Sequence, residues 1–192
     1  MNRWLMLIAL LLALRALAVE PNPSHSVIDD TGIDSQGLVS VNVGAGDLNQ
    51  QINARAIAIS AELATARLQL EQELELQSLD LSQDAQANLL GDSFSRNNGL
   101  IGVNQASGSG NQQINSFRLS LARQRQDLDD SVLAQQLVAP AQPSGATDQP
   151  KGNRIVVTDD KAFAGSRGVV QLNQSAGVGN QSVNSLSMTV VD

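Results

Sequence analysis

The alternation of apolar and polar residues is the most regular pattern in this chain. Val39, Val41 and Val43 alternate with small or polar residues, and Ile57 and Ile59 do the same farther along. A period of two residues is typical of a β-strand that buries one face. The pattern therefore predicts two short strands joined by a turn.

This two-arm unit occurs three times in the same frame, in cassette 1 (residues 37–59), cassette 2 (residues 99–121) and cassette 3 (residues 168–192). Amide side chains recur at four positions of each cassette: Asn42, Asn49, Gln50, Asn53, Asn104, Asn111, Gln112, Asn115, Asn173, Asn180, Gln181 and Asn184. Glycine admits the positive φ of a tight reversal, and it recurs between the arms at Gly46, Gly108, Gly110, Gly177 and Gly179. Such agreement in a fixed register indicates an internal repeat, which predicts stacked units.

Stacked cassettes would place the repeated amides in columns. In register, each amide could hydrogen-bond its copy about 4.8 Å above and below. An isolated two-stranded unit is only marginally stable in water, and its free edges are a template for further strands. The cassettes could therefore stack as a small solenoid within one chain, or against cassettes of other chains. The predicted partner-binding residues are the repeated amides together with the apolar second-arm residues Phe117, Leu119, Leu121, Leu186, Met188 and Val190.

The segments between the cassettes follow other patterns. Residues 19–36 combine two prolines with polar residues and predict a mobile arm. Residues 60–98 are rich in Leu, Glu, Gln and Ala and predict a helix-prone linker, although some of the leucines also alternate as in a strand. Residues 122–167 predict a short helix and then a flexible Pro/Gly-rich stretch, with residues 155–158 as a candidate strand before cassette 3.

Aromatic residues make up only 2% of the chain, which argues against a dense core. Apart from Trp4 they are Phe94, Phe117 and Phe163. A chain rich in Gln, Asn, Ser and Gly buries too little apolar surface to offset its ordering entropy. The predicted fold is therefore largely disordered when alone, with helix-prone linkers and three β-arch or hairpin cassettes able to form a β-solenoid-like stack.

The first 18 residues have the features of a secretory signal peptide. A basic start precedes an apolar run and then Ala16-Leu17-Ala18, which fits the small-x-small pattern at which such signals are cleaved. We therefore expect export to the periplasm, with no membrane anchor after cleavage. Loss of Arg3 and Arg15 leaves 10 basic residues against 19 acidic ones, which argues against a nucleic-acid partner. The chain has no cysteine and hence no disulfide framework.

Catalytic chemistry has little support in the sequence. His25 is the only histidine and has no thiol partner. The pairs Asp29-Asp30, Asp129-Asp130 and Asp159-Asp160 lack the spacing of a calcium loop and are interpreted as solvated surface charge. We therefore predict no enzyme activity, no metal and no cofactor.

Residues 98–115 (NGLIGVNQASGSGNQQIN) resemble the repeat of the Fap functional-amyloid system, whose fibril subunits carry segments of the form GxxGVNxAxGxGNQQxN. Cassette 3 departs from this form at Gln171 and Ser182, and cassette 1 has Leu48 in place of the second turn glycine. The resemblance covers the cassettes and the secretory signal but not the linkers.

Two further departures bear on the role that the resemblance implies. Fibril subunits of the system usually have a cysteine pair, which this chain lacks, and the linkers here carry the charges Arg67, Glu71, Glu73, Glu75, Arg123 and Arg125. Such charges oppose stacking. We therefore expect a periplasmic chaperone-like accessory that binds FapC-like and FapB-like subunits through shared cassettes and restrains their fibrillation in biofilm formation. The alternative is a minor fibril subunit or nucleator within the extracellular amyloid.

Overall fold

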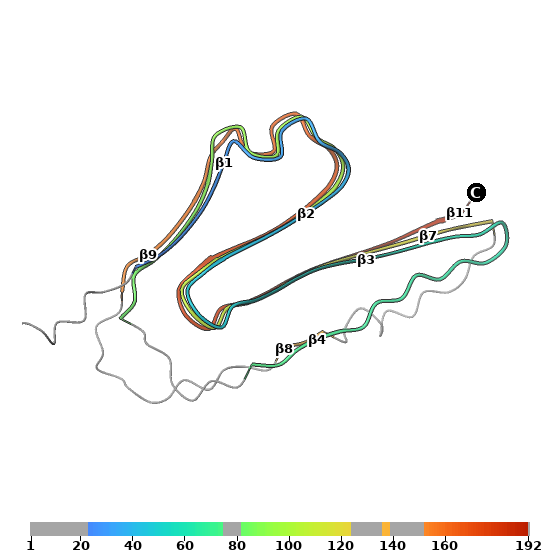
Figure 1. Ribbon diagram of the computed structural model, residues 1–192. Helices are drawn as coiled ribbons and strands as arrows, with labels where there is room; N and C mark the ends of the chain where they lie inside the picture. The colour runs from blue at the N-terminus through green and yellow to red at the C-terminus, as the bar shows by residue number, and fades with distance from the viewer. Residues whose placement is uncertain (1–22, 75–81, 124–135, 139–151, 192) are drawn as a thin grey trace, which may run out of the picture.

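The structure, a computed structural model, describes residues 23–74, 82–123, 136–138 and 152–191, so the predicted signal segment lies outside the described residues. Three layers of similar outline lie on top of one another (Figure 1). We call them rung 1 (residues 24–59), rung 2 (residues 85–122) and rung 3 (residues 154–191). Rung 1 contains β1 (Ser24–Asp29), β2 (Gln36–Ala45) and β3 (Gln50–Ile59); rung 2 contains β5 (Ala85–Leu90), β6 (Asn98–Ser107) and β7 (Gln112–Ala122); rung 3 contains β9 (Arg154–Thr158), β10 (Arg167–Ala176) and β11 (Gln181–Val191).

Corresponding strands of the three rungs form three parallel sheets. Their strand orders are β1-β5-β9, β10-β6-β2 and β11-β7-β3, so rung 2 lies in the middle. Two short linker strands, β4 (Leu70–Gln72) and β8 (Gln136–Val138), form a further parallel pair. The cassettes are in register, because Asn104 pairs with Asn42 on one side and with Asn173 on the other. The predicted stack is therefore present, and it forms within one chain.

Each cassette is a β-arch rather than a hairpin. β2 and β3 belong to different sheets, so they face each other through side chains instead of sharing backbone hydrogen bonds. The chain turns between them at Gly46, with the equivalent Gly108 in rung 2, and both have φ above 90°. A Cβ on Gly108 would lie 2.0 Å from the Gly177 carbonyl oxygen. Glycine is therefore required both by the backbone angle and by the close approach of the rungs.

The apolar core lies between the first and second sheets. Its buried members are Ile28, Leu89, Phe94, Ile101 and Val103. Phe94 is fully buried, and its ring stacks on Phe163 with centroids 5.5 Å apart. We call this region, between β1/β5/β9 and β2/β6/β10, the apolar arch.

The segments before and between the cassettes differ from the sequence prediction. Residues 24–29, assigned to a mobile arm, form β1, in which Ser24, Ser26 and Ile28 are buried. Residues 85–90 are mostly good helix formers but make the central strand β5, because pairing with β1 and β9 overrides local propensity. The expected disorder and helix-prone linkers are therefore not confirmed, and the described residues contain strands but no helix.

Two other predictions for the linkers have different outcomes. The candidate strand at residues 155–158 is confirmed as part of β9. The short helix expected over residues 122–138 falls mainly on residues 124–135, which lie outside the described residues, and its last three residues form β8 instead. The flexible Pro/Gly-rich stretch falls mainly on residues 139–151, which also lie outside the described residues.

Candidate assembly site: amide columns and open ends

Two asparagine columns fill the space between the second and third sheets, which we call the amide arch. In the first column, Asn104 Nδ2 donates to Asn42 Oδ1 (3.0 Å), and Asn173 Nδ2 donates to Asn104 Oδ1 (3.0 Å). In the second, Asn115 Nδ2 donates to Asn53 Oδ1 (2.9 Å), and Asn184 Nδ2 donates to Asn115 Oδ1 (3.1 Å). The four hydrogen bonds that link neighbouring rungs thus repeat one pattern.

The two columns are also joined within each rung. Asn53 donates to Asn42 Oδ1 (2.8 Å) in rung 1, and Asn115 donates to Asn104 Oδ1 (3.0 Å) in rung 2. Each column also donates across the arch to backbone carbonyls, as Asn115 does to Val103 (3.0 Å). Asn104 and Asn115 are 0% and 1% exposed. The hydrogen bonds of this network therefore replace the hydrogen bonds to water that these amides lose on burial.

Two further columns run along the turn and the start of the third sheet. Asn111 Nδ2 donates to Asn49 Oδ1 (2.9 Å), and Asn180 Nδ2 donates to Asn111 Oδ1 (2.7 Å). Gln112 Nε2 donates to Gln50 Oε1 (3.1 Å), and Gln181 Nε2 donates to Gln112 Oε1 (3.2 Å). All twelve sequence-predicted amides therefore lie in columns inside this chain, whereas their role in binding a partner stays a prediction.

The predicted apolar contact residues continue along the third sheet. Phe117 is 6% exposed and lies in register between Arg55 and Leu186. Leu119 is half-buried between Ile57 and Met188, which are exposed on the outer rungs. Arg55 donates to the Val39 carbonyl, and burial lowers its pKa below the ordinary arginine value. Rung 1 thus places a charge where the other rungs place apolar side chains.

The turn glycines have the backbone angles expected of them. Gly46, Gly108 and Gly177 have positive φ, as do Gly110 and Gly179 nearer the second arm. Leu48 stands at the position of Gly110 in rung 1 and also has positive φ (57°), which is costly for a residue with a Cβ.

A second set of glutamines was missed by sequence reasoning. Gln51 Nε2 donates to Gln113 Oε1 (2.9 Å) inside the amide arch. Gln174 Nε2 donates to Gln105 Oε1 (2.9 Å), and Gln105 reaches the carbonyl of Asn88 (2.8 Å) across the apolar arch. Gln105 and Gln174 are 69 residues apart, which is the spacing of cassettes 2 and 3. This recurrence was the sequence signal that could have predicted their column.

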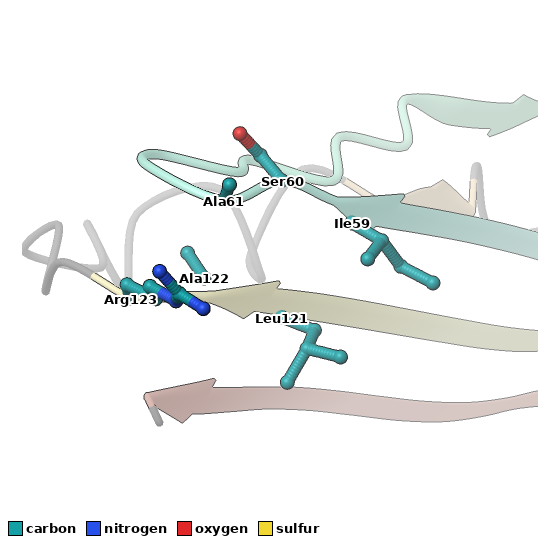
Figure 2. Close-up of a pocket in the computed structure, with 6 residues that line it drawn as sticks. All are labelled: Ile59, Ser60, Ala61, Leu121, Ala122 and Arg123. Carbon is teal, nitrogen blue, oxygen red and sulfur yellow. The ribbon is translucent and has the colours of Figure 1, made fainter.

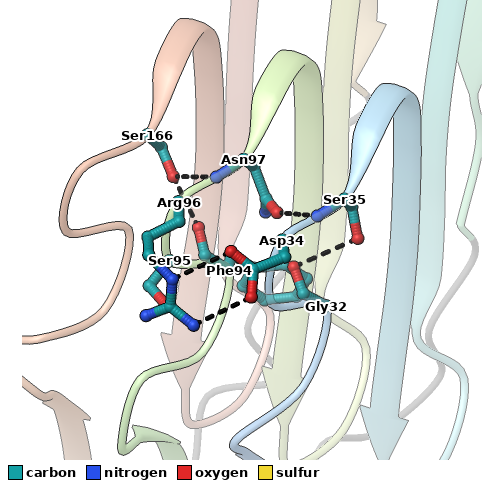
Figure 3. Close-up of polar contacts among 8 residues, drawn as sticks. All are labelled: Gly32, Asp34, Ser35, Phe94, Ser95, Arg96, Asn97 and Ser166. Carbon is teal, nitrogen blue, oxygen red and sulfur yellow. Dashed lines mark hydrogen bonds and ion pairs between the residues drawn. The ribbon is translucent and has the colours of Figure 1, made fainter.

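Sequence reasoning also missed the polar corner that joins β1 to β2 and repeats in the rungs (Figure 3). The Ser35 N–H donates to Asn97 Oδ1 (2.6 Å), and the Asn97 N–H donates to Ser166 Oγ (3.1 Å). Beside them Arg96 pairs with Asp34 at 2.8 Å. The hydrogen bond from Arg96 lowers the pKa of Asp34 from its ordinary value.

A shallow pocket of about 250 Å³ lies where β3 and β7 end. Its lining is Ile59, Ser60, Ala61, Leu121, Ala122 and Arg123 (Figure 2). The lining is mostly apolar, and it offers no nucleophile beside a general base. The described residues hold no group of three or more His, Cys, Asp or Glu side chains that could bind a metal ion. In the same residues we find no helix long and apolar enough to cross a membrane.

The stack is open at both ends within the described residues. In each of the three large sheets the edge strands belong to rung 1 and rung 3. Asn42 is more exposed than its fully buried rung 2 equivalent, and Val170 is 42% exposed although Ile101 is 1% exposed. Both ends therefore present strand edges, amides and apolar side chains on which another rung could stack.

Parallel, in-register strands joined by amide columns define a cross-β architecture of the amyloid kind. The family comparison agrees with this class: residues 15–191 match the family model described as "Functional amyloid protein FapB/FapC family", and the chain belongs to that family. The match is not to the accessory member FapA that the cysteine-free, charged linkers had suggested, and nothing in the comparisons supports that assignment.

A curated relative is also named as a functional amyloid protein. The chain is 30% identical over 146 residues to "Functional amyloid subunit FapC" of Pseudomonas aeruginosa (strain PAO1). The aligned region covers 73% of this chain but only 39% of FapC. No solved structure matches the chain.

Proposed function

We propose that this protein is a subunit of a functional amyloid fibril, in which copies add to the open ends of the stack. The observation that carries the proposal is the continuous register of the three rungs, since amide columns and parallel sheets reach both edges without a capping element among the described residues. Each added copy would satisfy one set of free backbone groups and extend four amide columns. Growth would therefore repeat contacts that already exist between rungs.

The proposed partners are further copies of this chain and subunits with homologous cassettes, FapC-like and FapB-like. The relative named a functional amyloid subunit supports this choice. Secretion through the periplasm to an extracellular fibril of a biofilm is part of the proposal, and it rests on the sequence of the first 18 residues. Incorporation as a minor subunit or nucleator is the form of this proposal that the sequence analysis already allowed.

A second candidate function is the chaperone-like accessory that binds subunits and restrains their fibrillation. The favouring observation is that rung 1 departs from the other rungs. Gly32 stands where rungs 2 and 3 have Phe94 and Phe163, and Arg55 stands where they have Phe117 and Leu186. A copy bound through rung 3 would then leave a poorly matched rung at the growing end.

Fibril growth separates the two candidates. Residues 19–192 would be incubated alone with an amyloid dye, with and without sonicated fragments of their own fibrils, and also added at one-twentieth of the concentration of the FapC relative. A subunit is expected to form fibrils alone, to shorten its own lag when seeded, and to shorten the lag of FapC. Absence of fibrils alone, together with a longer FapC lag, would overturn the subunit proposal and support the accessory.

A further inference from the structure

The four amide columns have a direction. In each, the amide NH₂ of the later rung donates to the oxygen of the earlier one, as Asn104 does to Asn42 and Asn173 does to Asn104. The same order holds for the columns through Asn115, Asn111 and Gln112. Each column therefore has an acceptor end in rung 1 and a donor end in rung 3, so its two ends differ. The rung 1 NH₂ groups donate to backbone carbonyls of this chain.

The two end rungs also differ in charge. Rung 1 carries Asp29, Asp30, Asp34 and Asp47 against the single arginine Arg55. Rung 3 carries Arg154, Lys161 and Arg167 against two aspartates. One end of the stack is thus acidic and the other is weakly basic.

Register brings one opposite pair to the same position. The Asp92 N–H donates to Asp30 Oδ1 (2.8 Å), so these residues lie side by side in rungs 1 and 2. Lys161 takes the place of Asp92 in rung 3, because the strands on both sides of it pair with rung 2 at the same 69-residue offset. If a second copy continued the stack, its Asp30 would lie beside Lys161 of the first.

A head-to-head junction would lose these matches. Two rung 1 ends would bring acidic residues together and oppose NH₂ groups to NH₂ groups. It would also make the facing strands antiparallel, whereas every pair between the described rungs is parallel.

We propose that the partner of each stack end is a second copy of this chain in one fixed orientation, with rung 3 of one copy on rung 1 of the next, and that the Lys161–Asp30 contact directs this polarity. The inference rests on the proposed subunit function and specifies its junction. Opposite charges at the junction steer the incoming copy and raise its association rate.

Complementary charge reversals test the polarity. Asp30→Lys makes both sides of a self-junction basic, and Lys161→Asp makes both sides acidic. Each variant would be grown from wild-type fibril fragments at low salt, alone and as an equimolar mixture, with elongation measured by dye fluorescence. Glu62→Lys and Arg67→Asp, two reversals of the same size at exposed linker positions, are the matched controls.

Each single variant is expected to elongate about tenfold more slowly than wild type, the mixture to recover to within about twofold, and the controls to grow like wild type. Recovery in the mixture also shows that both variants fold, since each then supplies the opposite charge to the other. Two outcomes would overturn the polarity alone, provided that the wild type grows. One is an Asp30→Lys variant that elongates like wild type, as a head-to-head junction requires. The other is a mixture that shows no recovery. Failure of wild-type protein to grow would instead overturn the subunit function.

Discussion

The apolar arch and the amide arch share the second sheet, but they hold the chain in different ways. In rung 2, Ile101 and Val103 point from β6 into the apolar arch, whereas the next residue, Asn104, points into the amide arch. Burying each large apolar side chain stabilises the fold by about 1.5–3 kcal/mol without demanding one geometry. Each amide hydrogen bond contributes only about 1 kcal/mol, but a buried amide left unpaired costs about 1–3 kcal/mol.

This difference separates stability from register. A stack that slipped by two residues could still bury valine and isoleucine in the apolar arch, because neighbouring core positions are alike. In the amide arch the same slip would place asparagine against Gly102 or Gln171 and leave buried donors unpaired. We infer that the apolar arch supplies most of the stability and the amide arch selects the register.

The largest expected effect comes from charging the amide arch. Asn104→Asp combined with Asn115→Asp places two buried carboxylates about 3 Å apart, since Asn115 Nδ2 now donates to Asn104 Oδ1 at 3.0 Å. Removing one partner of a buried charge pair costs about 3–5 kcal/mol, so we expect a loss of at least that size and no stacked state. Circular dichroism and urea unfolding would measure it. Asn98→Asp, an exposed change, is the control, and an equal loss in both variants would contradict the account.

Emptying the apolar arch is expected to cost less and to leave the register intact. Phe94→Ala removes a fully buried ring and its stack on Phe163, with an expected loss of about 3–4 kcal/mol in urea unfolding. The asparagine side-chain NMR signals should keep their dispersion. Phe163→Ala, at a half-buried position of an end rung, should cost less. A scrambled amide spectrum in Phe94→Ala would show that the two arches are not separable in this way.

A methyl group at the turn tests the rung spacing on which the amide columns depend. Gly108→Ala combines a φ of 98° with a Cβ only 2.0 Å from the Gly177 carbonyl oxygen, and we expect a loss of about 2–3 kcal/mol. Gly44→Ala is the matched control, because its nearest contact would be 3.7 Å away and its φ is ordinary. Thermal unfolding would compare the two. Similar melting temperatures would mean that the rungs can separate at the turn at little cost.

The smallest expected effect lies at the polar corner, where β1 joins β2 at the end of the apolar arch. Because Arg96 lowers the pKa of Asp34, the ionised carboxylate stabilises the fold above about pH 4, and this contribution is lost as pH falls through the lowered pKa. Asp34→Asn removes the contribution at every pH. The urea midpoints of wild type and variant should differ slightly at pH 7, since an exposed pair contributes little, and should converge once the pH falls below the lowered pKa of Asp34. A gap that widens at low pH would reverse the assigned sign.

The amide arch could be predicted from the sequence because its residues repeat by type. The recurrence of Asn42, Asn104 and Asn173 is enough to predict a column, and the alternating arms indicate strands. Whether the cassettes stack within one chain or between chains could not be decided, because the same hydrogen bonds satisfy both. A hairpin and a β-arch also show the same alternation of apolar and polar residues. They differ only in whether the two arms pair with each other or with strands of other rungs.

The sequence did not predict the first sheet of the apolar arch, because the residues of β1, β5 and β9 do not repeat from rung to rung. β1 (SHSVID), β5 (AQANLL) and β9 (RIVVT) carry different residues at nearly every paired position, and β5 contains good helix formers. Their strand structure comes from pairing with one another, which no local propensity contains. The spacing of Phe94 and Phe163, 69 residues as between Gly99 and Gly168, was the one signal that the repeat extends before the cassettes.

The central claim is that the register between rungs continues from one copy to the next, and cysteine pairs test it because the chain has no cysteine of its own. Ala54, Ser116 and Ser185 occupy one position in rungs 1, 2 and 3. Within a chain Ala54 and Ser185 are two rung spacings apart, about 9.6 Å, too far for a disulfide, whereas neighbouring rungs are close enough.

The decisive measurement is therefore oxidation of fibrils made from Ala54→Cys/Ser185→Cys, followed by a non-reducing gel. We expect a ladder of covalent oligomers from this variant. Ala54→Cys/Ser187→Cys, whose cysteines are offset by two residues, should give no covalent oligomers. Ser116→Cys/Ser185→Cys should form a disulfide within each chain. Fibrils that cross-link only through the offset pair, or that stay monomeric while the intrachain bridge forms, would contradict in-register stacking between copies.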